Sequence, residues 1–118
     1  MTTTATDCLF CRIVAREVPA EVVHETDTTL AFRDITPHAP VHVLVVPKAH
    51  QPTVVDTART DPRVLADVLV AAGEVARSEG LEQGYRLVVN TGPDAGQTVF
   101  HTHVHVLAGS TRMTEALV

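Results

Sequence analysis

Three histidines stand at alternate positions near the end of the chain, within the segment TVFHTHVHVLA at 98–108. Successive side chains of a β-strand point to opposite faces, so this spacing places His101, His103 and His105 together. The valines that follow in alternation point the other way, where they suit an apolar layer under a helix. The segment therefore predicts a strand over 98–108, with one covered face and a histidine face that is exposed or lines a cleft.

Local patterns predict most of the other elements. The segment DCLFCRIVAR repeats apolar residues at helical spacing, which predicts a short helix over 7–16, with Asp7 as N-cap and Pro19 after its end. Runs rich in β-branched residues, bounded by turn residues, predict strands. These runs cover 21–25, 29–34, 39–47 and 85–90.

A second, longer helix is predicted over 62–79. Asp61 is a suitable N-cap, Pro62 takes the favoured first position and Gly80 closes the end. One apolar stripe with a spacing of three and four runs along this segment. Its members are Val64, Leu65, Val68, Leu69, Ala72, Val75 and Ala76.

The order of elements indicates the fold class. A short helix, three strands, a long helix and two strands follow one another with short connections, which favours antiparallel pairing. We predict an α+β fold, a five-stranded antiparallel sheet with the helices packed on one face. At 118 residues the chain is expected to form a single domain over 1–118, with 1–6 as a frayed tail.

Charge and composition exclude several classes of function. A net charge of −5 argues against broad binding of nucleic acid or anionic membranes. Lys48 is the only lysine and no GxxxxGK segment exists, so a P-loop is excluded. The apolar run VLVVP is too short to cross a bilayer, and the first seven residues do not resemble a secretory signal. We therefore expect a cytoplasmic protein.

The alternate histidines have three possible uses: a solvated polar face, one shared metal, or separate tasks. The backbones of His101 and His105 are expected roughly 13 Å apart in a strand, whereas zinc needs nitrogens about 2 Å away, which favours separate tasks. Beside them, Gly92 and Gly96 allow a backbone anion nest. An anion cradle, a nucleophilic imidazole and a second histidine suit phosphoryl or nucleotidyl transfer.

The segment HTHVHVLAG resembles the HxHxHxx signature of the histidine triad (HIT) superfamily of nucleotide hydrolases and transferases. The segments LFCRIVAREVPAEVV, LAFRDITPHAPVHVLVVPKAH and GYRLVVNTGPDAGQTVFHTHVHVLAG resemble further family blocks in the family's order. Their details are most similar to the Hint-type nucleoside phosphoramidases. The resemblance implies a homodimer whose sheets join across a two-fold axis.

The resemblance also implies roles for individual residues. His103 would attack the α-phosphorus and carry a nucleotidyl intermediate, His105 would contact the phosphate, and His101 would orient the nucleophile. Asp34 would bind the ribose hydroxyls, which its two acceptor oxygens suit. The phosphate and ribose region would be held by Asn90, Gly96, Gln97 and Thr98. A purine slot would be lined by residues that otherwise suit a plain core: Phe10, Ile13, Phe32, Ile35 and Leu44.

Cys8 and Cys11 form a lone CxxC, which in a chain without a secretion signal favours metal binding or redox chemistry over a structural disulfide. Some bacterial HIT proteins bind zinc with such a pair, a histidine after the third strand and the first triad histidine. That likeness implies a Cys₂His₂ zinc site of Cys8, Cys11, His50 and His101. A reduced pair without metal is the alternative.

Three functions are weighed. The leading one is a hydrolase of purine nucleoside 5′-phosphoramidates, or related nucleotidyl compounds, that works through His103. The second is a nucleotide-binding regulatory or scaffold protein with incidental activity. The third is a dinucleoside polyphosphate hydrolase or nucleotidyltransferase of the same superfamily. No chemistry is assigned to His24, His38 or His42, and His42 is expected to be a hydrogen-bonded interior residue.

Overall fold

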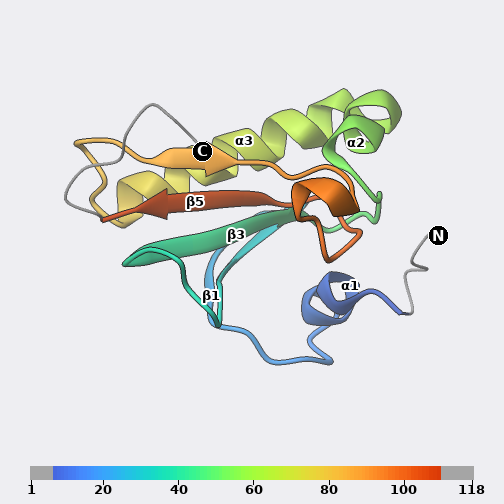
Figure 1. The fold of residues 1–118 in the computed structure, drawn as a ribbon, viewed down its shortest axis with the longest axis horizontal. Coiled ribbons are helices and arrows are strands. Elements are labelled where there is room, and N and C mark those ends of the chain that lie inside the picture. Colours follow the sequence, from blue (N-terminus) through green and yellow to red (C-terminus); the bar gives the residue numbers. More distant parts are fainter. Residues whose placement is uncertain (1–6, 110–118) are drawn as a thin grey trace.

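The structure, a computed structural model, describes residues 7–109, so the predicted frayed tail at 1–6 lies outside the described residues. Five strands form one sheet in the order β1-β2-β3-β5-β4, and every neighbouring pair is antiparallel (Figure 1). The predicted α+β class and five-stranded antiparallel sheet are thus confirmed. The strands are β1 Val22–Glu25, β2 Thr29–Arg33, β3 Val41–Pro47, β4 Arg86–Val88 and β5 Val104–Ala108.

Helices cover both faces of the sheet rather than one, which corrects the predicted arrangement. The long helix α3, Pro62–Ser78, lies along one face, and the short helix α1, Leu9–Val14, lies on the other (Figure 1). Strand β3 explains this, because Val43 and Val45 pack in the cluster under α3 while Leu44 and Val46 pack in the cluster with α1. A central strand that is apolar on both faces needs cover on both sides.

Helix α3 begins and ends almost as predicted. The Asp61 carboxylate accepts hydrogen bonds from the first backbone N–H groups, and Gly80 has a φ of 73° just beyond the end. The stripe is partly wrong: Leu69 is 47% exposed, whereas Ala71 is buried against the sheet. The buried face of the helix is thus rotated slightly from the predicted apolar stripe, and this rotation brings the small Ala71 against the sheet.

Helix α1 is shorter than predicted, and Cys8 rather than Asp7 is its N-cap. The Cys8 Sγ accepts a hydrogen bond from the Cys11 backbone N–H at 3.3 Å. The helix ends at Val14, before Pro19, because Arg16 adopts a left-handed φ of 64°. Within α1, the pair of cysteines therefore occupies the cap and the first turn.

A third helix, α2 at Val54–Thr60, was not predicted. The Thr53 hydroxyl accepts a hydrogen bond from the Asp56 N–H and donates one to the Asp56 carboxylate, a reciprocal cap. This Thr-x-x-Asp spacing was the signal that could have revealed the helix. The loop between β4 and β5, which contains Gly92 and Gly96, includes one short 3₁₀ turn, Pro93–Ala95.

The last strand is also shorter than predicted, since β5 begins at Val104 and residues 98–103 form no strand. The Thr102 N–H donates to the Gln51 carbonyl at 2.8 Å instead of to a strand neighbour. Two of the three alternate histidines therefore precede the sheet. The other four strands lie within their predicted ranges. No helix in the part of the chain from 7 to 109 is long and apolar enough to span a membrane.

Candidate functional site

His103 lies in the segment that leads into β5, and one hydrogen bond fixes its tautomer. Its Nδ1 is 2.7 Å from the His101 backbone carbonyl oxygen. A carbonyl can only accept, so Nδ1 carries the proton and Nε2 of the neutral ring keeps a free lone pair. This buried imidazole is therefore prepared to act as a nucleophile through Nε2.

His105, the next histidine along the chain, is set by a chain of two hydrogen bonds. The His38 backbone N–H donates to His42 Nδ1 at 3.0 Å, so neutral His42 carries its proton on Nε2. That Nε2 lies 2.9 Å from His105 Nδ1, which must then accept. The remaining proton of neutral His105 is on Nε2. The ring centres of His103 and His105 lie 5.1 Å apart. The lone pair on His103 Nε2 and the donor N–H on His105 Nε2 therefore belong to adjacent rings.

Burial keeps these rings uncharged. Burial, with smaller contributions from the neighbouring histidines His103 and His42, lowers the pKa of His105 from its ordinary 6.5 to about 4. Burial also lowers the pKa of His103 and of His42, partly offset for both by the Asp34 carboxylate. The neutral forms that the hydrogen bonds require are therefore the forms present at neutral pH.

The hydrolase activity predicted from the sequence should consequently persist in mild acid. Attack by His103 needs its unprotonated ring, and burial lowers its pKa below the ordinary 6.5. We expect the acid limb of the kcat/KM profile to fall below pH 6.5, measured from about pH 4.5 to 8. A half-loss of kcat/KM at or above pH 6.5 would contradict this assignment.

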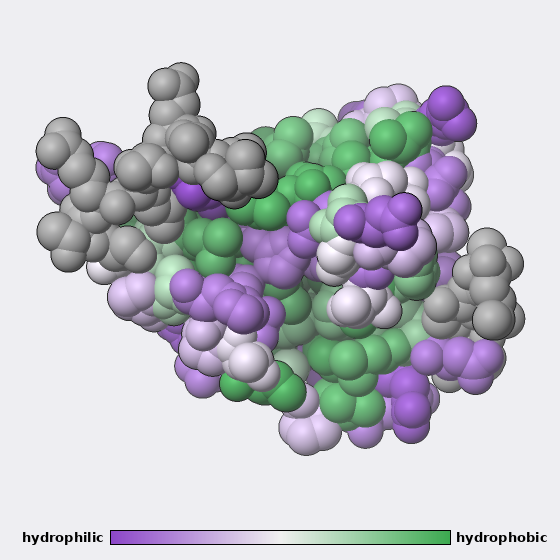
Figure 2. All heavy atoms as spheres, viewed as in Figure 1, coloured by the Kyte–Doolittle hydropathy of each residue, from purple (hydrophilic) through white to green (hydrophobic). Residues whose placement is uncertain are grey.

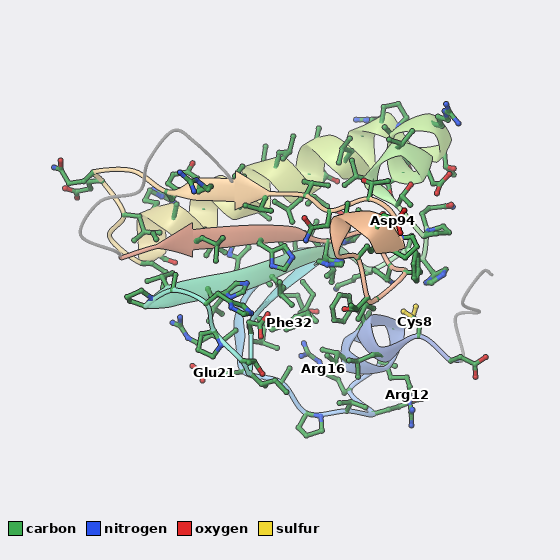
Figure 3. All side chains as sticks on the ribbon, in the orientation of Figure 1. Cys8, Arg12, Arg16, Glu21, Phe32 and Asp94 are labelled. Carbon is green, nitrogen blue, oxygen red and sulfur yellow. The ribbon has the colours of Figure 1, made fainter. Side chains whose placement is uncertain are left out.

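Two cavities meet at His103 and His105. The first has a volume of about 250 Å³ and lies between α1 and the sheet. Figure 2 shows hydrophobic residues gathered on the side of the molecule that carries α1, and Figure 3 shows Phe32 between the sheet and that helix. We call this space the apolar cavity. Its lining includes every predicted purine-slot residue, Phe10, Ile13, Phe32, Ile35 and Leu44, together with Leu9, Val99 and Arg33.

The second space, which we call the polar cavity, has a volume of about 350 Å³. Four residues line both cavities, so this is their common border: Asp34, Thr98, His103 and His105. The other lining residues of the polar cavity are His38, His42, Val88, Asn90, Gly96 and Leu107. The predicted phosphate and ribose residues Asn90, Gly96, Thr98 and Asp34 are thus brought together beside the histidines.

Gln97 is placed differently from the other predicted phosphate residues, because it lines neither of these two cavities. Its side-chain oxygen accepts from the Gly92 N–H at 2.9 Å. Its amide nitrogen donates to the carbonyl oxygens of Pro52 and Val99 at 2.7 and 3.1 Å. In this structure Gln97 holds the glycine-rich loop in shape, and Gly96 within that loop has a left-handed φ of 90°.

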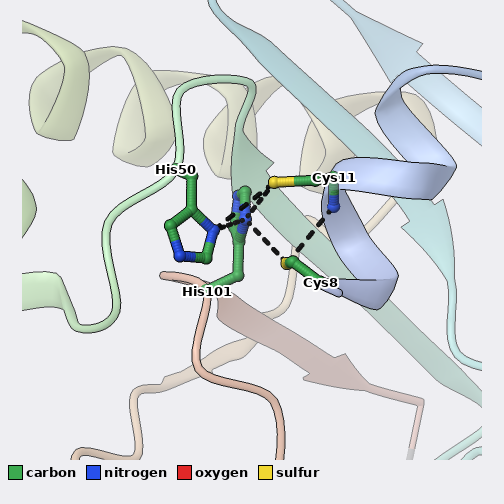
Figure 4. Close-up of side chains that lie close together, drawn as sticks. All are labelled: Cys8, Cys11, His50 and His101. Carbon is green, nitrogen blue, oxygen red and sulfur yellow. Dashed lines mark hydrogen bonds between the residues drawn. The ribbon is translucent and has the colours of Figure 1, made fainter. Parts of the chain in front are cut away.

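His101 faces away from the two cavities, toward the cysteines (Figure 4). Its Nε2 is 2.7 Å from the Pro47 carbonyl, so Nε2 carries the proton and Nδ1 presents a lone pair. That Nδ1 lies 3.3 Å from Cys8 Sγ, 3.4 Å from Cys11 Sγ and 3.2 Å from His50 Nδ1. Cys11 Sγ and His50 Nδ1 are 3.4 Å apart.

These separations fit one tetrahedral metal ion. Zinc bonds of about 2.3 Å to sulfur and about 2.0 Å to nitrogen give ligand–ligand distances of about 3.3 to 3.8 Å. Burial raises the pKa of Cys11 to about 12, and its hydrogen bond to Cys8 adds to the rise. A cation would reverse that effect, because thiolate is the ligand form. The donor set Cys₂His₂ is the one expected from the family resemblance.

A second group with suitable donor types consists of Asp34, His42 and His105. Here the fit to a metal fails, because His42 Nδ1 already accepts from the His38 N–H and the proton must sit on Nε2, which faces the group. A metal would need that position as a lone pair. His42 and His105 therefore form a hydrogen-bonded pair that positions His105, with the Asp34 carboxylate 3.5 Å from His42 Nε2.

Thr102, which lies between His101 and His103, is held by hydrogen bonds to residues outside the two cavities. The Thr102 hydroxyl donates to the Gln51 carbonyl at 3.2 Å and lies 2.7 Å from the Thr57 hydroxyl of α2. Together with the Thr102 N–H bond to Gln51, these contacts hold the main chain immediately before His103.

His42 is the site residue that sequence reasoning missed, since it was assigned no chemistry. The expectation that it is a hydrogen-bonded interior residue is nonetheless correct. A signal existed: His42 and Leu44 are two apart on β3, so they share the face that Leu44 was predicted to give to the purine slot.

We expect His42→Phe to lower kcat for the predicted nucleotide hydrolysis by about tenfold or more, because His105 loses the donor that fixes its tautomer. The Kd for AMP should stay nearly constant. Steady-state kinetics and calorimetric titration check this. His38→Gln is the matched control, since the His38 contact to His42 comes from the backbone and survives the substitution. Equal kcat values for His42→Phe and the unmodified protein would exclude the positioning role.

The fold and site define a small α+β domain whose histidines divide between a cleft and a Cys₂His₂ cluster. The chain belongs to the HIT domain family, whose model matches residues 15–112, and the resemblance stated from the sequence is confirmed. It is 41% identical over 106 residues to the purine nucleoside phosphoramidase of Escherichia coli, covering 89% of each chain. An uncharacterized HIT-like protein of Synechococcus elongatus is 46% identical over 103 residues, 87% of this chain and 90% of that one.

The fold itself matches solved structures of the family. A HIT family hydrolase from Clostridium thermocellum superposes with a TM-score of 0.91 at 43% identity, covering 97% of this chain and 100% of that chain. Together with the family match, this likeness confirms the HIT-like fold.

Proposed function

We propose that the protein hydrolyses purine nucleoside 5′-phosphoramidates and related nucleoside 5′-monophosphate derivatives through a covalent nucleotidyl intermediate on His103. The observation that carries the proposal is the bond from His103 Nδ1 to the His101 carbonyl, which leaves Nε2 as a lone pair at the border of two cavities. The phosphoramidase and hydrolase named among the relatives support the same reaction class.

The proposed reaction has two steps. His103 Nε2 forms a bond to phosphorus while the bond to the leaving nitrogen breaks, and that nitrogen departs as an amine with a proton from solvent. His105 Nε2–H donates a hydrogen bond to a phosphate oxygen and stabilises its charge. Water then attacks phosphorus, the bond to His103 breaks, and a proton returns to solvent. The net reaction converts the phosphoramidate and water to nucleoside monophosphate and amine.

Trapping the intermediate tests this function. Adenosine 5′-phosphoramidate is mixed with the protein, the reaction is quenched within its first turnover, and the peptides are analysed by mass spectrometry. We expect an added AMP group on the peptide that contains His103. AMP binding without turnover of any nucleotide would instead favour the scaffold function. Faster cleavage of a dinucleoside polyphosphate than of the phosphoramidate would favour the third function.

We further propose that Cys8, Cys11, His50 and His101 hold structural zinc. The four donor atoms lie within 4.8 Å of one another, and the His101 tautomer presents its lone pair to the other three. When bound, zinc would fasten α1 to the segment before β5. Elemental analysis of untagged protein purified without chelator should give about one zinc per chain. Metal-free protein of full stability would remove the proposal.

We propose, finally, a homodimer that joins two sheets along β4, an edge strand. Beside that edge lie Tyr85, Leu87 and Val89, which are 42%, 40% and 41% exposed, on the side of the sheet covered by α3 and its exposed Leu69. Such an apolar edge suits association with a second copy. The predicted cytoplasmic location stays a prediction.

Light scattering coupled to size-exclusion chromatography tests the dimer. We expect the unmodified protein to have twice the mass of one chain, and Leu87→Glu to shift it to a monomer because a charge enters the buried contact. Val55→Glu is the matched control, since Val55 is similarly exposed, at 46%, but lies on α2. A monomeric unmodified protein would contradict the dimer.

A further inference from the structure

The polar cavity is the place left for the leaving group, if the proposed function is correct. The apolar cavity suits the base, and the border residues place phosphorus beside His103 and His105. Once the nucleoside fills the apolar side, the remaining substituent on phosphorus has the polar cavity of about 350 Å³ on the opposite side. That volume is large enough for an amine with a sizeable side group.

The described lining of the polar cavity includes several polar side chains but no positively charged one. Among the described residues that line it there is one carboxylate, Asp34, and no lysine or arginine. The imidazoles of His42 and His105 are neutral, because burial lowers the pKa of each. Asn90 and Thr98 add uncharged donors and acceptors, while Val88 and Leu107 are apolar.

Two arginines lie near this lining without being part of it: Arg33 in the other cavity, and Arg86 on β4, opposite Leu107. Arg33 lines the apolar cavity, and its guanidinium donates to both oxygens of Glu79 at 2.8 and 3.0 Å and to Glu21 at 3.0 Å. Two carboxylates therefore already balance its charge. A negatively charged leaving group would meet the Asp34 carboxylate without a matching cation from the described lining.

We propose that the polar cavity selects leaving amines that carry no negative charge, and that His38 is the residue at which this specificity can be set. The exposed His38 ring lines the cavity, with its centre 5.7 Å from that of His42. Its backbone N–H, not its ring, makes the bond that fixes His42. The side chain can therefore be changed while the hydrogen bonds that set His105 are kept.

The test compares two substrates that differ in one charge: the adenosine 5′-phosphoramidates of phenylalanine amide and of phenylalanine with its free carboxylate. We expect kcat/KM to be about tenfold higher for the amide. His38→Lys should raise kcat/KM for the carboxylate about tenfold relative to the amide and so remove the preference, because a flexible ammonium can reach the cavity. His38→Gln is the neutral control and should keep the original ratio.

Each outcome decides between the inference and the function it rests on. Equal kcat/KM values for the two substrates in the unmodified protein, or a ratio that His38→Lys does not move, would overturn the charge selection while the hydrolase stands. Absence of the His103 adduct with both substrates would instead remove the proposed function. Thermal melting of each variant verifies that the fold is intact.

Discussion

His103→Ala should lower kcat for an adenosine phosphoramidate by about 10³-fold or more, with little change in the Kd for AMP. The lone pair of Nε2 is the nucleophile of the first step of the proposed reaction, so its removal ends the covalent route. The apolar cavity that would hold the base does not depend on this ring alone, since α1, β2 and the residues that follow each of them supply most of its wall. Single-turnover kinetics and calorimetry measure the two quantities.

Chemical rescue sharpens this prediction. The alanine variant leaves a space of imidazole shape beside His105, so added imidazole should restore part of the activity in a concentration-dependent way. His105→Ala offers the comparison: it removes a hydrogen-bond donor and not the nucleophile, so it should lose activity without forming a rescuable site. Retention of more than a tenth of the original kcat by His103→Ala would refute the intermediate.

Removal of the proposed zinc should have the second large effect, on stability and on nucleotide affinity together. A ligand present at a thousandfold its Kd stabilises a fold by about 4 kcal/mol, which for a chain of this length is a melting shift of about 10 °C or more. Chelation, or the Cys8→Ser/Cys11→Ser pair, should remove that increment. Helix α1 also carries Phe10 and Ile13, so the Kd for AMP should rise when the helix loosens.

The control for the metal lies on the same helix. Arg12 is on α1 between the two cysteines and Ile13, and Figure 3 shows it away from the cysteine side. Arg12→Ala should keep the zinc-dependent melting shift. A Cys8→Ser/Cys11→Ser protein that melts with the unmodified one, at matched zinc, would show that the cluster contributes no metal-dependent stability.

Local signals predicted most of the sheet. The β-branched runs that became β1 to β4, and the caps of α3, depend on short-range rules that the fold obeys. The family likeness supplied the cavity residues, because a cavity joins positions as distant as Phe10, Asp34 and Asn90. No local pattern contains that information.

The errors share one physical cause: each depends on contacts between residues that are far apart in the sequence. The strand predicted at 98–103 fails because Thr102 bonds to Gln51 rather than to a neighbouring strand. Helix α1 lies on the opposite face from α3 because β3 is apolar on both sides, which was not considered in predicting the fold from the sequence. His42 was overlooked because its importance depends on a contact to His105, 63 residues away.

The anchoring of Thr102 makes the geometry of catalysis depend on a part of the chain far from the cleft. Gln51 and Thr57 hydrogen-bond to Thr102 and so position the segment that carries His103. Neither Gln51 nor Thr57 lines either of the two cavities. Natural or engineered variation in that part of the chain would then change turnover while leaving ligand recognition almost untouched. In this domain, rate and recognition are adjustable from different regions of the sequence.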